Sequence, residues 1–191
     1  MNNSFFALVF RQRYIKRWGL MRNVSDESLS EHSAQVAMLA HALALIGNKH
    51  FSKEYDPGEV AVAALYHDAS EVYTGDMPTP VKYFTEEMRS NYKAIEENAL
   101  SVLLSHVPEE MREDYRDILA YPDELETIVK AADKLSAYIK CIEEVKFGNS
   151  EFISAKESTL ASIRAMKCPE LDYFVDVFLP SFELTLDEMQ K

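Results

Sequence analysis

The feature that most constrains the fold is a series of helix start signals with no strand signal between them. Ser28-Leu29-Ser30-Glu31 is a capping box, in which the serine and glutamate side chains each satisfy a backbone N–H of the other residue. Asp56-Pro57-Gly58-Glu59 combines an N-cap acceptor, a proline at the first helical position and a glutamate at the third. Only five glycines occur, and the chain contains no Asn-Gly hairpin dipeptide. These observations predict an all-α protein.

The apolar periodicity extends these signals along the chain. We predict helices over residues 3–16, from Ser28 to Gly47, from Asp56 to Thr74-Gly75, over about 85–105, from Pro108, from Pro122-Asp123 to Gly148, and near 150–167 and 169–179. An acidic tail follows. No repeat, low-complexity tract or linker interrupts the 191 residues, so we expect one irregular helical bundle, a single domain over residues 1–191.

The charge is strongly acidic and unevenly distributed. The net charge of −12 argues against a nucleic-acid polymer as a partner. Residues 1–25 nevertheless contain five basic residues and no acid, which leaves 15 basic and 32 acidic residues in the rest. A basic segment that pairs with an acidic body explains this most simply. The alternative is that one or two of these arginines meet an anionic ligand.

The remaining composition bears on the cellular compartment. No apolar run approaches the ~18 residues of a membrane span. The basic residues near the N-terminus follow its apolar patch, whereas a secretory signal has them before it. Cys141 and Cys168 lack a CxxC spacing, which fits a reducing compartment. We expect a cytoplasmic protein without a membrane partner.

The stretch YHDASEVYTGDMPTP contains the first candidates for chemistry. His67 and Asp68 are adjacent, so their side chains point ~100° apart on a helix and reach one centre only if it lies between them. Glu71 lies one turn after His67, on the same face. A lone His-Asp pair is more often a buried, hydrogen-bonded pair than half of a metal site. The small apolar residues before the pair and the polar loop after it favour a site.

Two further residues lie on other predicted helices. His32 follows the capping box, where a lone histidine is more often a surface or capping residue. His41, on the same helix, is expected to be a core histidine or a neighbour of the site rather than a ligand. Asp133 lies at the edge of the apolar face of its helix, where a carboxylate is costly unless it is paired or bound to a metal. Lys130 or Lys134 could also be its partner.

Together His32, His67, Asp68 and Asp133 form a set of two imidazoles and two carboxylates without a thiolate. Such a set suits a divalent ion such as Mn²⁺, Co²⁺, Fe²⁺ or Zn²⁺. A helical bundle builds a metal site in this way, with ligands from several helices. A di-iron bundle would need paired Glu-x-x-His motifs, and the sequence has none.

This H…HD…D pattern resembles that of the HD-domain metal-dependent phosphohydrolases. The segments KRWGLMRNV, SEHSAQVAMLAHALA, LYHDASEVYTGDMPTPVKYF, AADKLSAYIKCIEE and DYFVDVFLPSFELTLDE are similar to the bacterial 5′-deoxynucleotidases of that superfamily. The resemblance implies a homodimeric enzyme that uses a divalent cation, Co²⁺, Mn²⁺ or similar. Its substrates would be deoxyribonucleoside 5′-monophosphates, which it would convert to deoxyribonucleoside and phosphate.

The resemblance also implies roles for individual residues. The metal ligands would be His32, His67, Asp68 and Asp133, three of which (His32, Asp68 and Asp133) would also border the substrate. Glu71 would act on the attacking water, Arg17 would orient the phosphate, and Trp18 would contact the substrate. Trp18 could equally be an ordinary core tryptophan. The segment Asp76, Met77, Pro78 and Thr79 would line the sugar and base side of the pocket.

Prolines 78 and 80 predict a rigid wall there, which favours steric exclusion of the 2′-hydroxyl. Two alternatives stay open at this point. One is another HD-type hydrolase acting on a cyclic nucleotide, a nucleoside triphosphate or an alarmone. The other is a non-catalytic regulatory module.

Overall fold

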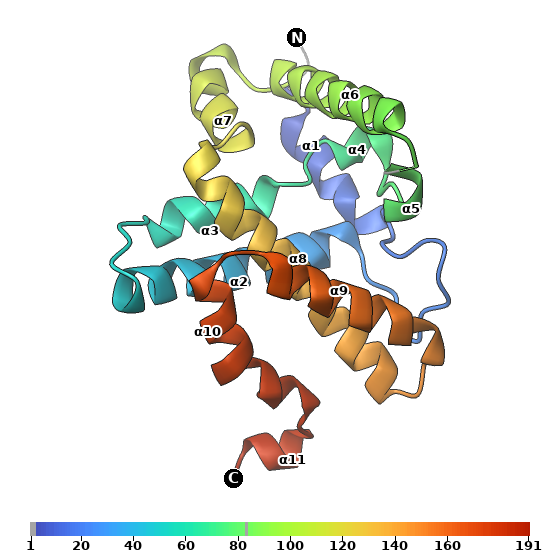
Figure 1. Ribbon diagram of the computed structural model, residues 1–191. Helices are drawn as coiled ribbons and strands as arrows, with labels where there is room; N and C mark the ends of the chain where they lie inside the picture. Colours follow the sequence, from blue (N-terminus) through green and yellow to red (C-terminus); the bar gives the residue numbers. More distant parts are fainter. Residues whose placement is uncertain (1–2, 83) are drawn as a thin grey trace. The chain divides into compact units, whose positions relative to one another are not determined.

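The computed structural model describes residues 3–82 and 84–191, and its regular elements over those residues are all helical (Figure 1). The elements, with η for 3-10 helices, are α1 (Phe5–Val9), η1 (Phe10–Tyr14), α2 (Leu29–His50), α3 (Pro57–Tyr66), α4 (Glu71–Thr74), α5 (Thr79–Lys82), α6 (Glu86–Ser105), η2 (Glu109–Met111), α7 (Arg112–Leu119), α8 (Asp123–Lys146), η3 (Ser150–Phe152), α9 (Ile153–Ala165), α10 (Pro169–Val177), η4 (Leu179–Glu183) and α11 (Leu186–Met189). The predicted all-α class is confirmed.

Both predicted start signals act as expected. At α2 the Ser28 backbone N–H donates to the Glu31 carboxylate (2.7 Å), and the Glu31 N–H donates to the Ser28 hydroxyl (3.3 Å). At α3 the Asp56 carboxylate accepts from the backbone N–H groups of Gly58 (2.8 Å) and Glu59 (3.1 Å). Side-chain capping therefore determines where these two helices begin.

Two predicted helix boundaries are wrong. α2 does not stop at Gly47 but continues to His50. Gly47 serves close packing instead, because a Cβ there would lie 2.9 Å from the Tyr55 ring. The helix predicted from Asp56 to Thr74 is broken after Tyr66: residues 67–70 form a turn in which the Glu71 N–H donates to the Asp68 carbonyl (3.1 Å). The break places His67 and Asp68 in a turn rather than on a helix face.

The chain divides into two compact units whose segments alternate along the sequence. The first contains the described residues of Met1–Arg22, Asp26–Ser33 and Tyr66–Pro122; the second contains Asn23–Ser25, Ala34–Leu65 and Asp123–Lys191. The single domain expected over residues 1–191 stays a prediction.

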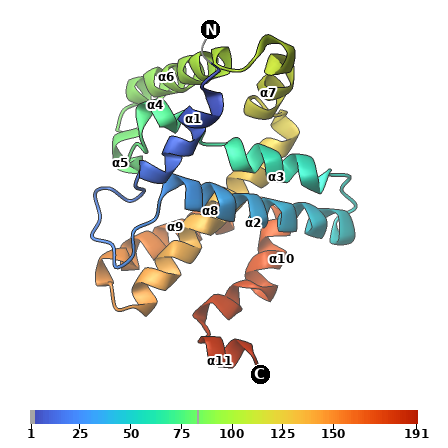
Figure 2. The same cartoon turned by 180° about the vertical axis from the view of Figure 1, so that it is seen from behind.

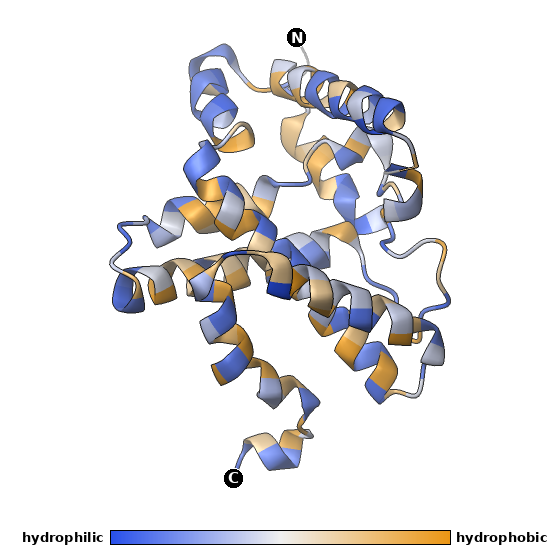
Figure 3. Ribbon diagram, viewed as in Figure 1, coloured by the Kyte–Doolittle hydropathy of each residue, from blue (hydrophilic) through white to orange (hydrophobic). Residues whose placement is uncertain are grey.

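In the first unit, α1, α4, α5 and α7 pack against α6 (Figures 1 and 2). An apolar cluster of Phe5, Ala69, Leu103, Val107 and Leu119 is buried among them. Because Ala69 belongs to the turn that carries His67 and Asp68, this cluster anchors the turn. α7 contributes only a narrow apolar edge and is coloured mostly hydrophilic in Figure 3.

In the second unit, α9 lies along α8, and α10 and η4 also contact α8 (Figure 2). The apolar face predicted for α8 is confirmed, since these five side chains are buried: Ile128, Val129, Ala132, Leu135 and Ile139. Among the described helices, none combines the length and the apolar character that a bilayer crossing requires.

Candidate metal centre

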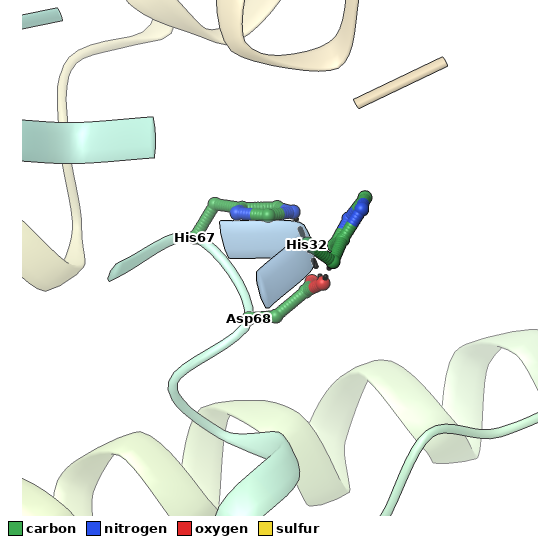
Figure 4. Close-up of side chains that lie close together, drawn as sticks. All are labelled: His32, His67 and Asp68. Atoms are coloured by element: carbon green, nitrogen blue, oxygen red, sulfur yellow. Dashed lines mark ion pairs between the residues drawn. The ribbon is translucent and has the colours of Figure 1, made fainter. Parts of the chain in front are cut away.

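His32, His67 and Asp68 converge in the first unit (Figure 4). Oδ2 of Asp68 lies 3.0 Å from Nε2 of His67 and 3.7 Å from Nε2 of His32. His32 is completely buried and the His67 side chain is 8% exposed. Two residues from one turn and a third from the start of α2 thus present their polar atoms to the same point.

The three donor groups fit a divalent cation. One ligand atom from each residue lies within 4.8 Å of the others, and bonds of ~2.0–2.2 Å place two ligands of one ion up to about 4.4 Å apart. The two measured distances fall inside that span. Imidazole nitrogens with a carboxylate oxygen suit borderline divalent ions. Because both imidazoles face the same carboxylate oxygen, the arrangement exceeds what a simple buried His-Asp pair needs.

The N-terminal segment is placed beside α2 by backbone pairing. Lys16 and Ser28 form an antiparallel bridge, the Leu29 N–H donates to the Ile15 carbonyl (2.9 Å), and the Arg17 N–H donates to the Glu27 carbonyl (3.0 Å). The sequence predicted a basic segment here, and this pairing brings one of its arginines to the site.

Arg17 and Trp18 share one anchor. Oε2 of Glu27 accepts hydrogen bonds from Nε of Arg17 (3.2 Å) and from Nε1 of Trp18 (3.0 Å). Nη1 of Arg17 also lies 3.7 Å from Oδ2 of Asp68. Trp18 is half-buried with a backbone φ of 59°, so it is not an ordinary core tryptophan. Glu27 was missed by sequence reasoning because nothing distinguishes it from the neighbouring acids.

Glu71 opens α4 and is buried with a perturbed acidity. Burial, together with the negative charges of Asp68 and Asp76, raises the pKa of its carboxyl to about 9, although Arg17 and Lys82 oppose the shift. Its Oε2 atom is buried and has no hydrogen-bond partner among the described residues. A positive charge nearby would strongly stabilise the ionised form of a carboxyl group in this environment.

Residues 76–79, hereafter the DMPT segment, follow α4 through Gly75, whose φ of 71° lies in the left-handed region. The Asp76 carboxyl accepts a hydrogen bond from the Trp18 backbone, and burial raises its pKa against the effect of Arg17. Met77 and Pro78 are half-buried and Thr79 is exposed. The loop predicted to reach Pro80 is shorter than expected, because α5 begins at Thr79.

Asp133 lies on α8, in the second unit, and is half-buried. Its role as the fourth ligand stays a prediction. His41, on the α2 residues of the same unit, is exposed. The expectation that it is a core histidine is wrong, because its side of α2 is not covered.

Comparison with solved structures assigns the fold. An HD-domain phosphohydrolase from Listeria innocua matches with a TM-score of 0.82 and 24% identity, covering 98% of this chain and 92% of that one. A cyanophage S-2L HD phosphohydrolase, DatZ, solved with dA and one catalytic Zn²⁺ ion, matches with a TM-score of 0.69 and 20% identity over 94% and 96% of the two chains. The chain therefore has the fold of the HD-domain phosphohydrolases.

Sequence comparison identifies the family within that class. Residues 4–182 match the model of the 5′-deoxynucleotidase YfbR-like family. The 5′-deoxynucleotidase YfbR of Escherichia coli is 50% identical over 192 residues, covering 99% of this chain and 96% of the relative. The chain belongs to the YfbR-like 5′-deoxynucleotidase family. The predicted family and enzyme class are confirmed.

Proposed function

We propose that the chain is a metal-dependent phosphohydrolase that converts deoxyribonucleoside 5′-monophosphates to deoxyribonucleosides and phosphate. The observation that carries the proposal is the convergence of His32, His67 and Asp68, with the Arg17 guanidinium 3.7 Å from the Asp68 carboxylate. Membership of the 5′-deoxynucleotidase family supports the substrate class.

His32, His67 and Asp68 would hold the cation, with Asp133 as the proposed fourth ligand. A bound divalent cation would acidify water and polarise a phosphoryl oxygen, which is the chemistry that a resistant phosphate monoester requires. Co²⁺, Mn²⁺ or a similar ion suits the ligand set, and the cyanophage relative of this fold was solved with Zn²⁺.

Arg17 would orient the substrate phosphate. Its guanidinium has five N–H donors, and the bond from Nε to Glu27 fixes the plane of the group while leaving others for phosphate oxygens. Trp18, fixed by the same Glu27 oxygen, would then pack against the sugar or base.

Glu71 would take the proton of the attacking water at its carboxyl group. It must be a carboxylate to do so, and a cation held by the neighbouring ligands would lower the pKa that burial and the neighbouring acids raise to about 9. Binding of the cation would in this way prepare the base for its task.

The DMPT segment would form the wall on the sugar and base side, with His32, Asp68 and Asp133 bordering the substrate on the side of the metal. A narrow wall rejects an added hydroxyl better than a pocket that merely lacks a partner for it. We therefore attribute the preference for deoxyribose to steric exclusion by this segment.

We also propose that the chain acts as one HD-type domain, as a homodimer and in the cytoplasm. The family resemblance supports the dimer. Both cysteines, Cys141 and Cys168, are buried thiols that do not form a disulfide, which supports a reducing compartment. The net charge of −12 supports a small-molecule substrate rather than a nucleic-acid polymer.

The role of the metal centre is tested with an Asp68→Asn variant of the full chain. After chelation and addition of Mn²⁺ we expect phosphate release from dAMP by the wild type and at least a ~100-fold loss in the variant, with weaker Mn²⁺ binding. Asp26→Asn is the matched control, because Asp26 is exposed and forms its ion pair with the equally exposed Lys16. Equal activity of wild type and Asp68→Asn would refute the proposed centre.

A further inference from the structure

The DMPT segment is held at both ends by the same helix, α6. Before it, the Tyr92 hydroxyl donates to Oγ1 of Thr74 (3.3 Å), and Thr74 in turn donates to the Gly75 carbonyl (3.0 Å). After it, Nζ of Lys82 donates to Oε1 of Glu96 (2.8 Å). Tyr92 and Glu96 are four residues apart on α6, so they share a face of the helix.

The second anchor is more than a surface ion pair. Lys82 and Glu96 are only 29% and 25% exposed, and Nζ of Lys82 also lies 4.7 Å from the centroid of the Tyr92 ring. An ammonium group that contacts both a carboxylate and an aromatic face has a restricted position, so the lysine side chain is held in one orientation. The pair Lys93–Glu97 on the same helix provides the contrast, with side chains 76% and 67% exposed and 4.0 Å apart.

Within the segment, Asp76 accepts a hydrogen bond from the Trp18 backbone, and the Pro78 carbonyl accepts from the Val81 N–H (2.8 Å), whereas Met77 is less well supported. A cavity of about 370 Å³ is lined by Met77 together with Tyr92, Ile95, Ala99 and Val102 of α6. A side chain that borders a hollow has fewer packing contacts than one in a close-packed core. The position of the segment therefore depends on its two anchors to α6, while Met77 itself borders open space.

We propose that Tyr92 and Glu96, acting through Thr74 and Lys82, are positioning residues that fix the DMPT segment and set the discrimination between deoxyribose and ribose. The inference rests on the proposed function, in which this segment forms the wall at the sugar. A wall excludes one oxygen atom only if it does not yield, and the cavity that Met77 lines leaves this side chain room to move. Loss of either anchor should therefore raise kcat/KM for ribonucleotides more than it lowers kcat/KM for deoxyribonucleotides.

The test measures kcat and KM for dAMP and AMP in full-length, metal-loaded wild type, Lys82→Met, Glu96→Gln and Tyr92→Phe. We expect the dAMP/AMP ratio of kcat/KM to fall about three- to tenfold in each variant, through a lower KM for AMP. Lys82→Arg should keep the wild-type ratio of kcat/KM for dAMP to that for AMP.

The double variant Lys82→Met/Glu96→Gln should have the same ratio as the single variants, because the two residues act as one pair. Lys93→Met and Glu97→Gln are the matched controls and should change nothing.

Each outcome separates the two proposals. If the wild type prefers dAMP and the variants keep its ratio, the α6 anchors do not set selectivity and the inference is wrong. An equal loss on both substrates in Lys82→Met, with Glu96→Gln unaffected, overturns it as well, because Lys82 would then act on the phosphate or on the acidity of Glu71 rather than through the segment. If the wild type releases no phosphate from dAMP, the proposed function itself fails, and the inference fails with it. Tyr92→Phe keeps the buried ring, so its result does not depend on refolding of the core.

Discussion

Glu71 is the residue whose environment differs most from that of an ordinary carboxyl group. It is 7% exposed, lies near the negative charges of Asp68 and Asp76, and has an Oε2 atom without a hydrogen-bond partner among the described residues. Such an arrangement disfavours folding, because a buried polar atom without a partner costs ~1–3 kcal/mol, and a residue kept in it despite this cost is a candidate for function. These features support the proposal that Glu71 accepts the proton of the attacking water.

The first prediction concerns Glu71→Gln. We expect turnover on dAMP to fall at least ~100-fold, since the amide keeps the shape but cannot accept the proton. Bound metal, measured by elemental analysis, should stay at the wild-type level. Glu86→Gln, on the exposed side of α6, is the control and should retain full activity. Loss of metal from Glu71→Gln would instead identify Glu71 as a ligand.

The second prediction is a pH dependence of stability in the metal-free protein. The carboxyl of Glu71 has a pKa of about 9 in the folded chain and 4.5 as the reference value, so the folded state retains a proton that the unfolded state has lost. The free energy of unfolding should therefore fall as pH rises from about 4.5 to 9, by up to ~1.4 kcal/mol per pH unit. Denaturant titrations after chelation measure it. Glu71→Gln should remove this part of the slope, and an unchanged slope would contradict the assigned pKa.

At the scale of elements, the turn over residues 67–70 shows what the sequence could not reveal. The periodicity of EVAVAALYHDASEVY continues through the turn, so it predicted one helix. The break depends on tertiary packing, in which Ala69 joins the buried cluster around Phe5. The capping signals, by contrast, are local, and the starts of α2 and α3 were predicted for that reason.

The same distinction applies to the site. His32, His67 and Asp68 were predicted as a group from residue type and from the family resemblance, and they do lie together. The sequence did not single out the residues that orient the site. Glu27 binds Arg17 and Trp18, while Tyr92 and Glu96 hold the residues on either side of the DMPT segment. Sequence patterns identify reactive groups more readily than the residues that orient them.

The third prediction concerns the loop before α2, which α8 holds through one buried carboxylate. Glu144 is 1% exposed and accepts hydrogen bonds from Lys140, Asn149 and the backbone N–H groups of Val24 and Ser25. Burial disfavours the charge, but these four donors lower its pKa to about 2. We expect Glu144→Ala to lower the free energy of unfolding by ~3–5 kcal/mol, since the buried Lys140 loses its counter-charge and keeps only the two oxygens of Ser25.

Chemical denaturation at pH 7 measures this loss. Glu126→Ala is the matched control, because Glu126 forms an ion pair with Lys130 on the same helix at the same spacing, with side chains 47% and 61% exposed. A change within ~0.5 kcal/mol is expected there. A similar small change for Glu144→Ala would show that its donors are satisfied by water instead.

The fourth prediction addresses the wall itself. Met77→Ala and Thr79→Ser shorten side chains of the DMPT segment and should raise kcat/KM for AMP relative to dAMP. Thr79→Ser removes one heavy atom and Met77→Ala removes three, and a single methylene in a pocket wall changes discrimination by ~10- to 200-fold. Parallel kinetics on both substrates measure the ratio. If both variants keep it, the residues that exclude the 2′-hydroxyl lie outside this segment.

At the scale of the whole molecule, the charge distribution agrees with an acidic enzyme that binds a small anion. The acid-free segment of residues 1–25 supplies Arg17 to the centre, while the rest of the chain has a net charge of −17. The anion requires local positive charge, which this segment and the cation together would supply. This distribution agrees with a strongly acidic chain whose substrate is a small phosphate ester.

The most direct test of the account is a substrate panel on chelated full-length protein to which Mn²⁺ or Co²⁺ is added back. Released phosphate is measured with dAMP, AMP, dATP and a cyclic nucleotide. The account predicts metal-dependent release from dAMP, weaker release from AMP, and none from dATP or the cyclic nucleotide. Hydrolysis of dATP or the cyclic nucleotide without hydrolysis of dAMP would contradict it, and inactivity with every metal would favour a regulatory module.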